Sequence, residues 1–180
     1  MSFDLPASVT VSGIDYPVRT DFRVILEIFV MLDDPDLTDA DKTEALIRMF
    51  YMERPSDPEA ALQAFSEFCD PRSAARSGQK PSGCLIDWNQ DFDLMIAPIN
   101  HILGFECRTA EHLHWRTFLS AYLEIPPESV FARVLRIREK LRTGKKLEKC
   151  ERQWYNKNRD LVHLKPKYSK VEEDILNEWT

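Results

Sequence analysis

The stretch IDWNQDFDLMIAPINHILGFECRTAEHLHWRTFLSAYLEIP, residues 86–126, holds the most distinctive pattern of the chain. Its two motifs read Asp87-Trp88-x-x-Asp91-Phe92-Asp93 and Leu113-His114-Trp115-x-x-Phe118-Leu119. Apolar residues recur at helical spacing through this region, and the stripe of the second motif continues to Tyr122. We therefore expect two helices here, over roughly 90–103 and 109–123, with Thr109 as the N-cap of the second.

The flanking sequence continues the helical pattern and adds one hairpin. Residues 9–18 alternate apolar and polar side chains around Ser12-Gly13, which predicts two short antiparallel strands. Capping residues and prolines place further helices at 21–32, 38–53, 57–68, 128–142, 145–162 and 169–179. The sequence thus predicts a mainly α protein, a helical bundle of about six to eight helices with a short N-terminal β-hairpin.

Residues 70–85 interrupt this pattern. They read DPRSAARSGQKPSGCL, and their Ser, Gly, Pro and Arg content indicates an exposed, flexible loop. The loop separates the hairpin and helices of residues 1–69 from the motif-bearing helical region of residues 86–164, and a C-terminal tail helix follows at 165–180. A length of 180 residues suits a single domain overall.

The net charge of −6 conceals an uneven distribution of charge. Residues 1–131 carry 10 Lys and Arg against 22 Asp and Glu, whereas residues 132–170 carry 14 against 4. The last ten residues add four carboxylates and no basic side chain. An acidic body with a basic arm bears on the choice of partners rather than on the fold.

Composition also bears on location. No apolar run approaches the roughly 20 residues that span a bilayer, and the N-terminus lacks the basic and apolar regions of a secretory signal. The four cysteines are scattered, without a Cys-x-x-Cys pair, which favours reduced thiols. We expect a cytoplasmic protein with no membrane partner.

Two groups of residues resemble parts of metal sites. Asp87, Asn89 and Asp91 match the first three ligand positions of an EF-hand loop. Phe92 and Pro98 stand where that loop needs its Gly and its bidentate Glu. Carboxylates that favour the dipole at a helix N-terminus are the simpler interpretation, with Trp88 and Phe92 packed on each other four residues apart.

The second group offers the nitrogen and sulfur donors that zinc prefers. Its members are Cys84, His101, Cys107, His112 and His114. Their spacing matches no standard zinc motif, and two histidines two residues apart on a helix point in different directions. We therefore expect no metal and no cofactor.

Catalytic patterns are missing from the sequence as well. It contains no Gly-x-Ser-x-Gly, no His-Glu-x-x-His and no glycine-rich phosphate loop. Gly144-Lys145-Lys146 follows Thr143 but lacks the upstream glycine of a P-loop. The sequence predicts a protein that is not an enzyme and has no catalytic residues.

The order of the motifs resembles a known family. After the two motifs of residues 86–126 come Phe131-Ala-Arg-Val-Leu-Arg-Ile-Arg and Trp154-Tyr155, and Thr20-Asp21-Phe22-Arg23 lies near the N-terminus. In this order they resemble the "gene product fifteen" proteins of long-tailed phages and prophages of Gram-positive bacteria. These are encoded close to the tape-measure protein and are regarded as tail assembly chaperones. The resemblance is best from Asp87 to about Leu164.

That resemblance implies a binding protein that covers the long, helical, apolar tape-measure protein until tail-tube protein polymerises around it. The implied partners are the tape-measure protein and the tail-tube protein. The implied place of action is the host bacterial cytoplasm, and the protein would be absent from the mature virion. The family supplies no catalytic residue to transfer to this chain.

The candidate partner-binding surface combines aromatic residues with a charged rim. Its residues are Trp88, Phe92, Trp115, Phe118, Trp154, Tyr155, Arg138, Arg142, Lys145 and Lys146. Aromatic residues at helical spacing are equally typical of a core, and interleaved charges are equally typical of a solvated helix face. Both interpretations stay open at the level of sequence.

Two further partners follow from the charge. The basic arm is able to meet the acidic body of another copy, which predicts self-association. Alternatively, the protein is a nucleic-acid-associated phage or bacterial protein whose basic C-terminal helices, over residues 133–167, neutralise phosphates. The acidic N-terminal region favours a protein partner, because it repels a polyanion.

Overall fold

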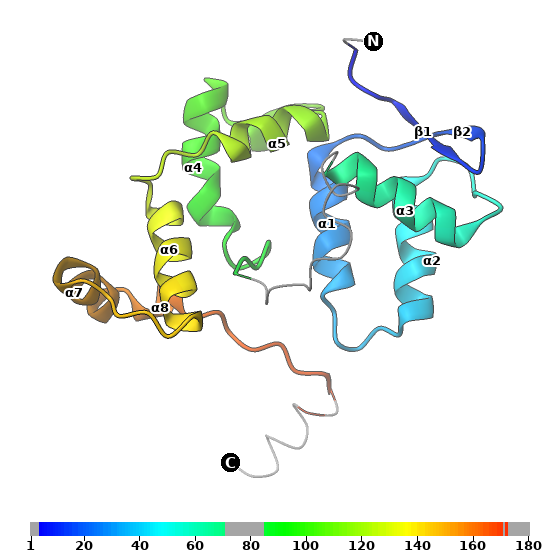
Figure 1. Cartoon of the computed structure of the whole chain (residues 1–180). Coiled ribbons are helices and arrows are strands. Elements are labelled where there is room, and N and C mark those ends of the chain that lie inside the picture. The colour runs from blue at the N-terminus through cyan, green and yellow to red at the C-terminus, as the bar shows by residue number, and fades with distance from the viewer. Residues whose placement is uncertain (1–3, 71–84, 171, 173–180) are drawn as a thin grey trace. The chain divides into compact units, whose positions relative to one another are not determined.

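The computed structural model describes residues 4–70, 85–170 and 172 (Figure 1). Its elements are β1 (Ser8–Val11), β2 (Ile14–Pro17), α1 (Phe22–Leu32), α2 (Asp39–Phe50), α3 (Pro58–Cys69), α4 (Phe92–Leu103), the 3-10 helix η2 (Cys107–Thr109), α5 (Trp115–Leu123), α6 (Val130–Arg142), α7 (Lys149–Lys157) and α8 (Arg159–Val162). They confirm the expected mainly α fold with a short N-terminal hairpin. The predicted loop at 70–85, apart from its two end residues, and most of the predicted helix at 169–179 lie outside the described residues.

The chain divides into two compact units, which we call unit 1 and unit 2. Unit 1 consists of residues 1–80, 111–119 and 167–180, and unit 2 consists of residues 81–110 and 120–166. The division passes through α5. Each unit is therefore assembled from segments that are distant in the sequence.

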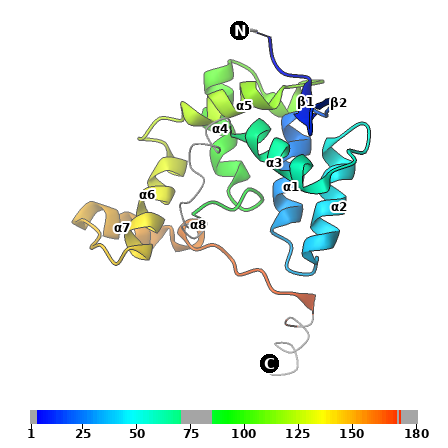
Figure 2. The ribbon, with the colours of Figure 1, turned by 45° about the vertical axis from the view of Figure 1, so that its right-hand side comes forward.

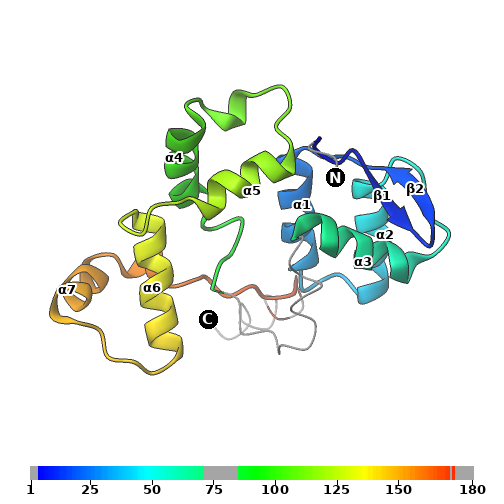
Figure 3. The same ribbon diagram turned by 45° about the horizontal axis from the view of Figure 1, so that its top comes forward.

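In unit 1, the hairpin packs against the first helices. Ser12 and Gly13 have positive φ angles of 49° and 84°, as both central residues of a type I′ hairpin turn require. Val11 lies opposite Ile14 in the antiparallel register. The two strands lie side by side, β1 contacts α3, and α2 contacts both α1 and α3 (Figures 2 and 3).

The core of unit 1 is built largely from aromatic rings. The Phe50 ring lies 4.9 Å from that of Phe65 and 5.1 Å from that of Phe68, measured between centroids. Phe22 stacks on Phe118 at 4.5 Å, with 12° between the ring planes. Each such pair adds roughly 0.5–1.5 kcal/mol beyond the burial of its apolar surface.

Unit 2 contains α4, α6, α7 and α8. α6 contacts α4 and α8, and α7 contacts α8. The buried stripe of α6 is Phe131, Val134 and Ile137, and α4 contributes Met95 and Ile99. This spacing of three and four residues is the helical periodicity of a face turned to the core.

The predicted helix at 109–123 begins later than expected. Thr109 ends the short helix η2 and does not cap α5, which starts only at Trp115. Leu113 and His114 are extended because their backbone groups pair with residues 20–22 of unit 1. A tertiary contact thus overrides local helical propensity here.

Two other helices are shorter than predicted. The helix expected at 145–162 is two helices, α7 and α8, separated at Asn158, whose φ and ψ are −131° and 36°. The helix expected at 38–53 ends at Phe50, since Tyr51 forms a β-bridge with Val18. Its start is as predicted, with Thr38 and Asp41 in a capping box.

Candidate functional site

The N-terminal motif and the Leu113-His114-Trp115 motif meet in unit 1. Asp21 is the N-cap of α1, and its carboxylate accepts hydrogen bonds from the backbone N–H groups of Arg23 at 2.9 Å and Leu113 at 3.1 Å. The backbone N–H of Phe22 donates to the carbonyl of Leu113 at 2.9 Å. The backbone N–H of Trp115 donates to the carbonyl of Thr20 at 2.6 Å. These motifs therefore join two segments of unit 1.

Hydrogen bonding at this joint changes the acidity of Asp21. Partial burial raises the pKa of its carboxyl group, but hydrogen bonds from the side chain and backbone of Arg23 and from the backbone of Leu113 lower it more. The pKa of Asp21 is consequently held below its usual range. The ionised carboxylate of Asp21 is the form that accepts the hydrogen bonds connecting the two segments.

Trp115 and Phe118, two of the candidate partner-binding residues, lie in the core of unit 1. Their exposed fractions are 2% and 0%. The indole N–H of Trp115 donates to the carbonyl of Cys69 at 3.0 Å, and its ring meets Phe29 at 5.7 Å. Burial leaves neither side chain a surface that a partner is able to contact.

Arg138, a third candidate, forms the central ion pair of unit 2. Its guanidinium binds both carboxylate oxygens of Asp91, at 2.6 and 2.9 Å, and both side chains are almost fully buried. Its remaining donors reach the carbonyls of Leu85, Leu161 and Val162 at 2.9, 2.9 and 2.7 Å. All five N–H donors of the guanidinium are satisfied, so Arg138 connects α4, α6, α8 and the segment before Asp87.

Asp87 and Asp91, the first two aspartates of the first motif, thus have a structural role. Asp87 accepts hydrogen bonds from the backbone N–H groups of Asn89 at 3.0 Å and Gln90 at 2.9 Å. Asp91 accepts one from the backbone of Asp87 at 3.0 Å besides those of Arg138, and its side chain makes no cap hydrogen bond to α4. Asp91 is therefore the N-cap residue of α4, but its carboxylate binds Arg138 and Asp87 rather than the first turn of the helix.

The described residues also bear on the metal sites considered above. Within residues 4–70, 85–170 and 172, no three His, Cys, Asp or Glu side chains gather as they would to hold a metal ion. His112 instead pairs with Thr20 through Nε2 at 3.0 Å, and Nε2 of His114 lies 2.9 Å from the carbonyl oxygen of Pro6. Cys84 lies outside the described residues.

Trp88 and Phe92 are half-buried in unit 2. The Trp88 ring lies 5.5 Å from that of Tyr122, which in turn meets Phe131 at 6.0 Å. Phe92 is the first residue of α4. Trp88 therefore belongs to a chain of aromatic rings that reaches α6, and part of its surface faces solvent.

Trp154 and Tyr155, the remaining aromatic candidates, both lie on the basic helix α7. α7 contains no buried residue, and both rings are half-buried. The guanidinium of Arg133 lies over the Trp154 ring at 5.4 Å, and that of Arg159 lies over Tyr155 at 5.6 Å. The Tyr155 hydroxyl and Nε2 of His163 are 2.7 Å apart.

Some cations around α7 are paired within unit 2. Lys140 donates to both carboxylate oxygens of Glu151 at 2.7 Å, and Arg136 lies 3.7 Å from the same carboxylate. The hydrogen bonds from Lys140 hold the pKa of Glu151 below its usual range. Arg142 pairs with Glu139 at 2.6 Å. The two pairs with Glu151 connect α6 to α7, and the pair of Arg142 lies within α6. All three leave fewer charges for a partner than the sequence suggests.

Other cations face solvent. In the part of the chain that the structure describes, the exposed basic residues near α7 with neither an ion pair nor a ring contact include Lys145, Lys146, Lys149, Arg152 and Lys157. A pocket of about 290 Å³ adjoins α7 through His163, whose Nε2 lies 2.7 Å from the Tyr155 hydroxyl. The pocket is also lined by Leu85, Arg138, Leu141, Arg142, Val162 and Leu164. We call α7, its exposed cations and this pocket the α7 surface.

Sequence reasoning placed Arg138 at the rim of the surface and missed its role inside unit 2. Arg138 follows Val134 by four residues and Ile137 by one, so it continues the buried stripe of α6. A basic residue on an apolar stripe, with an aspartate in a second apolar region, was the available signal. It indicates a buried pair, because a charge inside a protein needs a partner.

The comparisons with known proteins agree with the motif order. The family model described as "Bacteriophage Gp15 protein" matches residues 1–164. The chain belongs to this family of phage proteins, and the matched range contains the motifs of both units. The comparisons with curated proteins and with solved structures gave no match. Among the described residues, no helix combines the length and the apolar character that crossing a membrane requires.

Proposed function

We propose that this phage protein is a tail assembly chaperone that binds the tape-measure protein and keeps it soluble until the tail tube forms. It acts in the cytoplasm of a Gram-positive host, has no enzymatic activity, and is absent from the mature virion. The family membership supports this proposal, and so does a surface suited to binding rather than to catalysis.

The observation that carries the proposal is the α7 surface. Trp154 and Tyr155 stay half-exposed on a helix with no buried residue. Five exposed cations without an ion pair lie on the same helix and in the loop before it. Trp, Tyr and Arg are the residues on which binding energy most often concentrates in protein interfaces. The amphipathic character fits a partner helix with an apolar stripe and acidic flanks.

The proposed mechanism needs reversible binding. The aromatic rings and the adjacent pocket cover apolar side chains of the tape-measure helix, and the cations set its register against acidic side chains. Tail-tube protein then displaces the chaperone by covering the same apolar stripe. A modest contact area with an exposed polar rim permits this exchange, because such interfaces are weak and transient.

Co-expression with the tape-measure protein encoded nearby tests the proposal. We expect a soluble, stoichiometric complex, with the tape-measure protein insoluble when it is expressed alone. The variant Trp154→Ala with Lys145→Gln and Lys146→Gln should abolish the complex. A matched control is Arg48→Gln with Arg54→Gln, which removes two cations that are 76% and 63% exposed in unit 1. The proposal fails if no complex forms, or if the control disrupts it as strongly as the α7 variant.

Charge supports self-association as a second element of the proposal. Unit 1 carries 11 Lys and Arg against 20 Asp and Glu, and unit 2 carries 13 against 10. A net of −9 on one unit and +3 on the other favours contact between unit 1 of one copy and the α7 surface of a second. Sedimentation should then show oligomers at low salt that dissociate as the salt concentration rises. An unchanged sedimentation coefficient between low and high salt contradicts this element.

The alternative is a nucleic-acid-associated protein that uses the same cations. The stacked arrangement of Arg133 on Trp154 and the exposed lysines favour it. It predicts binding to DNA or RNA that is independent of sequence and weakens steeply with salt. Binding to a tape-measure fragment that persists at moderate salt, without binding to nucleic acid, supports the chaperone instead.

A further inference from the structure

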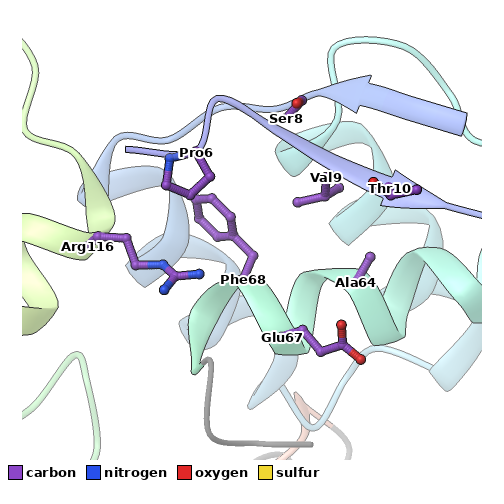
Figure 4. Close-up of a pocket in the computed structure, with 8 residues that line it drawn as sticks. All are labelled: Pro6, Ser8, Val9, Thr10, Ala64, Glu67, Phe68 and Arg116. Atoms are coloured by element: carbon purple, nitrogen blue, oxygen red, sulfur yellow. The ribbon is translucent and has the colours of Figure 1, made fainter. Parts of the chain in front are cut away.

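A pocket in unit 1 lies along the outer edge of the hairpin. It has a volume of about 460 Å³ and lies between β1 and α3 (Figure 4). Pro6, Ser8, Val9 and Thr10 line one side, Ala64, Glu67 and Phe68 of α3 line the other, and Arg116 completes it. This groove, which we call the β1 groove, is separate from the residues of the α7 surface.

The register of the hairpin shows which backbone groups point into the groove. Val11 and Ile14 flank the two-residue turn, so they form a hydrogen-bonded pair, and Val9 with Tyr16 is the next such pair. Ser8 and Thr10 are the alternate positions, whose backbone N–H and C=O groups point away from β2. Both residues line the pocket.

Those four outward groups are unpaired among the residues that the structure describes. Within the described residues, no hydrogen bond from another segment reaches the backbone N–H or C=O of Ser8 or Thr10. The edge is limited on one side by Pro6, which has no N–H and whose carbonyl oxygen lies 2.9 Å from Nε2 of His114. On the other side it ends at the turn. The free edge thus consists of the outward backbone groups of Ser8 and Thr10. An unpaired strand edge is a template for another strand.

The floor and the ends of the groove restrict what fits there. Phe68 and Ala64 give an apolar floor opposite Val9 (Figure 4). The Arg116 guanidinium lies over the Phe68 ring at 5.5 Å, and Glu67 on α3 is exposed. Asp70 also acts on Arg116 electrostatically. An arginine has five N–H donors, so it is able to serve two carboxylates.

We propose that the β1 groove binds an extended segment of a partner protein as an additional strand. The segment pairs its backbone with Ser8 and Thr10, places one apolar side chain on Phe68, and directs a carboxylate at Arg116. Main-chain hydrogen bonds then supply affinity and the alternate side chains supply specificity. The occupant is extended and acidic at one end, unlike the helical partner of the α7 surface, so either site is able to exist without the other.

A displayed library of random dodecapeptides, selected on the full chain, tests this inference. Enriched peptides should share an apolar residue next to an acidic one, and their affinity should fall about ten-fold or more in Arg116→Gln, as the loss of a charged hydrogen bond implies. Ser8→Pro removes an outward N–H without removing a bond between β1 and β2, so it should weaken binding as well. Arg48→Gln is the matched control and should leave the affinity unchanged.

A second measurement needs no variant. In the free protein, the amides of Ser8 and Thr10 should exchange hydrogen quickly while that of Val9 is protected by pairing with β2, and a bound peptide should slow the first two. The inference is overturned if no peptide is enriched, if enriched peptides bind wild type and Arg116→Gln alike, or if exchange at Ser8 and Thr10 is unchanged. Displacement of the peptides by a synthetic peptide of residues 171–180 identifies the chain's own C-terminal segment as the occupant and overturns the assignment to a partner.

Discussion

Unit 1 and unit 2 keep their family motifs in place by different interactions. In unit 1, the motifs at Phe22 and Phe118 meet through stacked rings and a few backbone hydrogen bonds. In unit 2, the Asp91 motif is held by one buried guanidinium that binds a carboxylate and three carbonyls. Removal of one ring leaves neighbouring rings that partly fill the space, whereas removal of one charge leaves the opposite charge buried and unpaired.

The aspartates of the acidic, aromatic motifs have structural roles in both units. Asp21, Asp87 and Asp91 all accept backbone or arginine hydrogen bonds within their own unit. Each carboxylate is thereby held by donors of its own unit. The most distinctive acidic residues of the sequence therefore contribute hydrogen bonds that hold the fold together.

Breaking the ion pair of unit 2 should have the largest effect on stability. Arg138→Leu leaves Asp91 buried without its partner and should lower the free energy of unfolding by about 3–5 kcal/mol in urea denaturation. The double variant Arg138→Leu with Asp91→Leu removes both charges and should recover part of this loss. A single variant that unfolds at the wild-type urea concentration would show that the pair contributes little.

Truncation in the aromatic core of unit 1 should come next. Phe118→Ala removes a fully buried ring and should cost about 3 kcal/mol or slightly more. Hydrogen exchange should show the loss in the amides of α1 and α3, while those of α4 and α6 keep their protection. Phe118→Leu is the control, since it keeps most of the volume and should cost less than about 1.5 kcal/mol. Equal loss of protection in both units contradicts the separation between them.

The joint at Asp21 should have a smaller effect that depends on pH. The pKa of Asp21 in the folded state lies below the ordinary aspartate value of 3.8. Its contribution to stability is therefore present above that value and is lost as pH falls through the folded pKa. Asn is as good an N-cap as Asp, so Asp21→Asn mainly removes the charge that pairs with Arg23. It should therefore cost about 1 kcal/mol at neutral pH and little under strongly acidic conditions. Urea denaturation of both proteins along a pH series measures this convergence. A difference that stays constant with pH would assign the effect to geometry alone.

The exposed cations should have the smallest effect on folding. Lys145→Gln with Lys146→Gln changes side chains that face solvent, so the free energy of unfolding should stay within about 0.5 kcal/mol of wild type. Thermal unfolding is a sufficient measurement. A larger loss would mean that these lysines support unit 2, and their use in mapping a partner surface would be compromised.

Features with local signals were predictable from the sequence. The turn at Ser12-Gly13, the cap at Asp21 and the capping box at Thr38 depend on residues within four positions of one another. The start of α3 at Pro58, with Asp57 accepting from the backbone of Ala60, is of the same kind. In each case the chemistry of a few neighbouring side chains determines the backbone.

Errors arose where distant segments decide the conformation. Leu113 and His114 have a helical context in the sequence, yet they are extended because they pair with residues 20–22, about ninety positions earlier. The burial of the aromatic candidate residues was difficult to predict for the same reason. Trp115 and Trp154 both lie on helices at apolar spacing, and only the packing of unit 1 places one in a core while the other stays half-exposed on α7. The β1 groove depends on β1, α3 and Arg116 together, so no local pattern predicts it.

The division of unit 1 among three segments has a consequence for synthesis on the ribosome. A nascent chain of 80 residues contains the hairpin and α1–α3 but not Trp115 or Phe118, which fill the centre of that unit. At roughly 5–20 residues per second, the missing residues follow within several seconds. During that interval the rings of Phe22 and Phe29 lack the neighbours they have in the folded protein. Completion of unit 1 during translation must therefore wait until the central motif has left the ribosome.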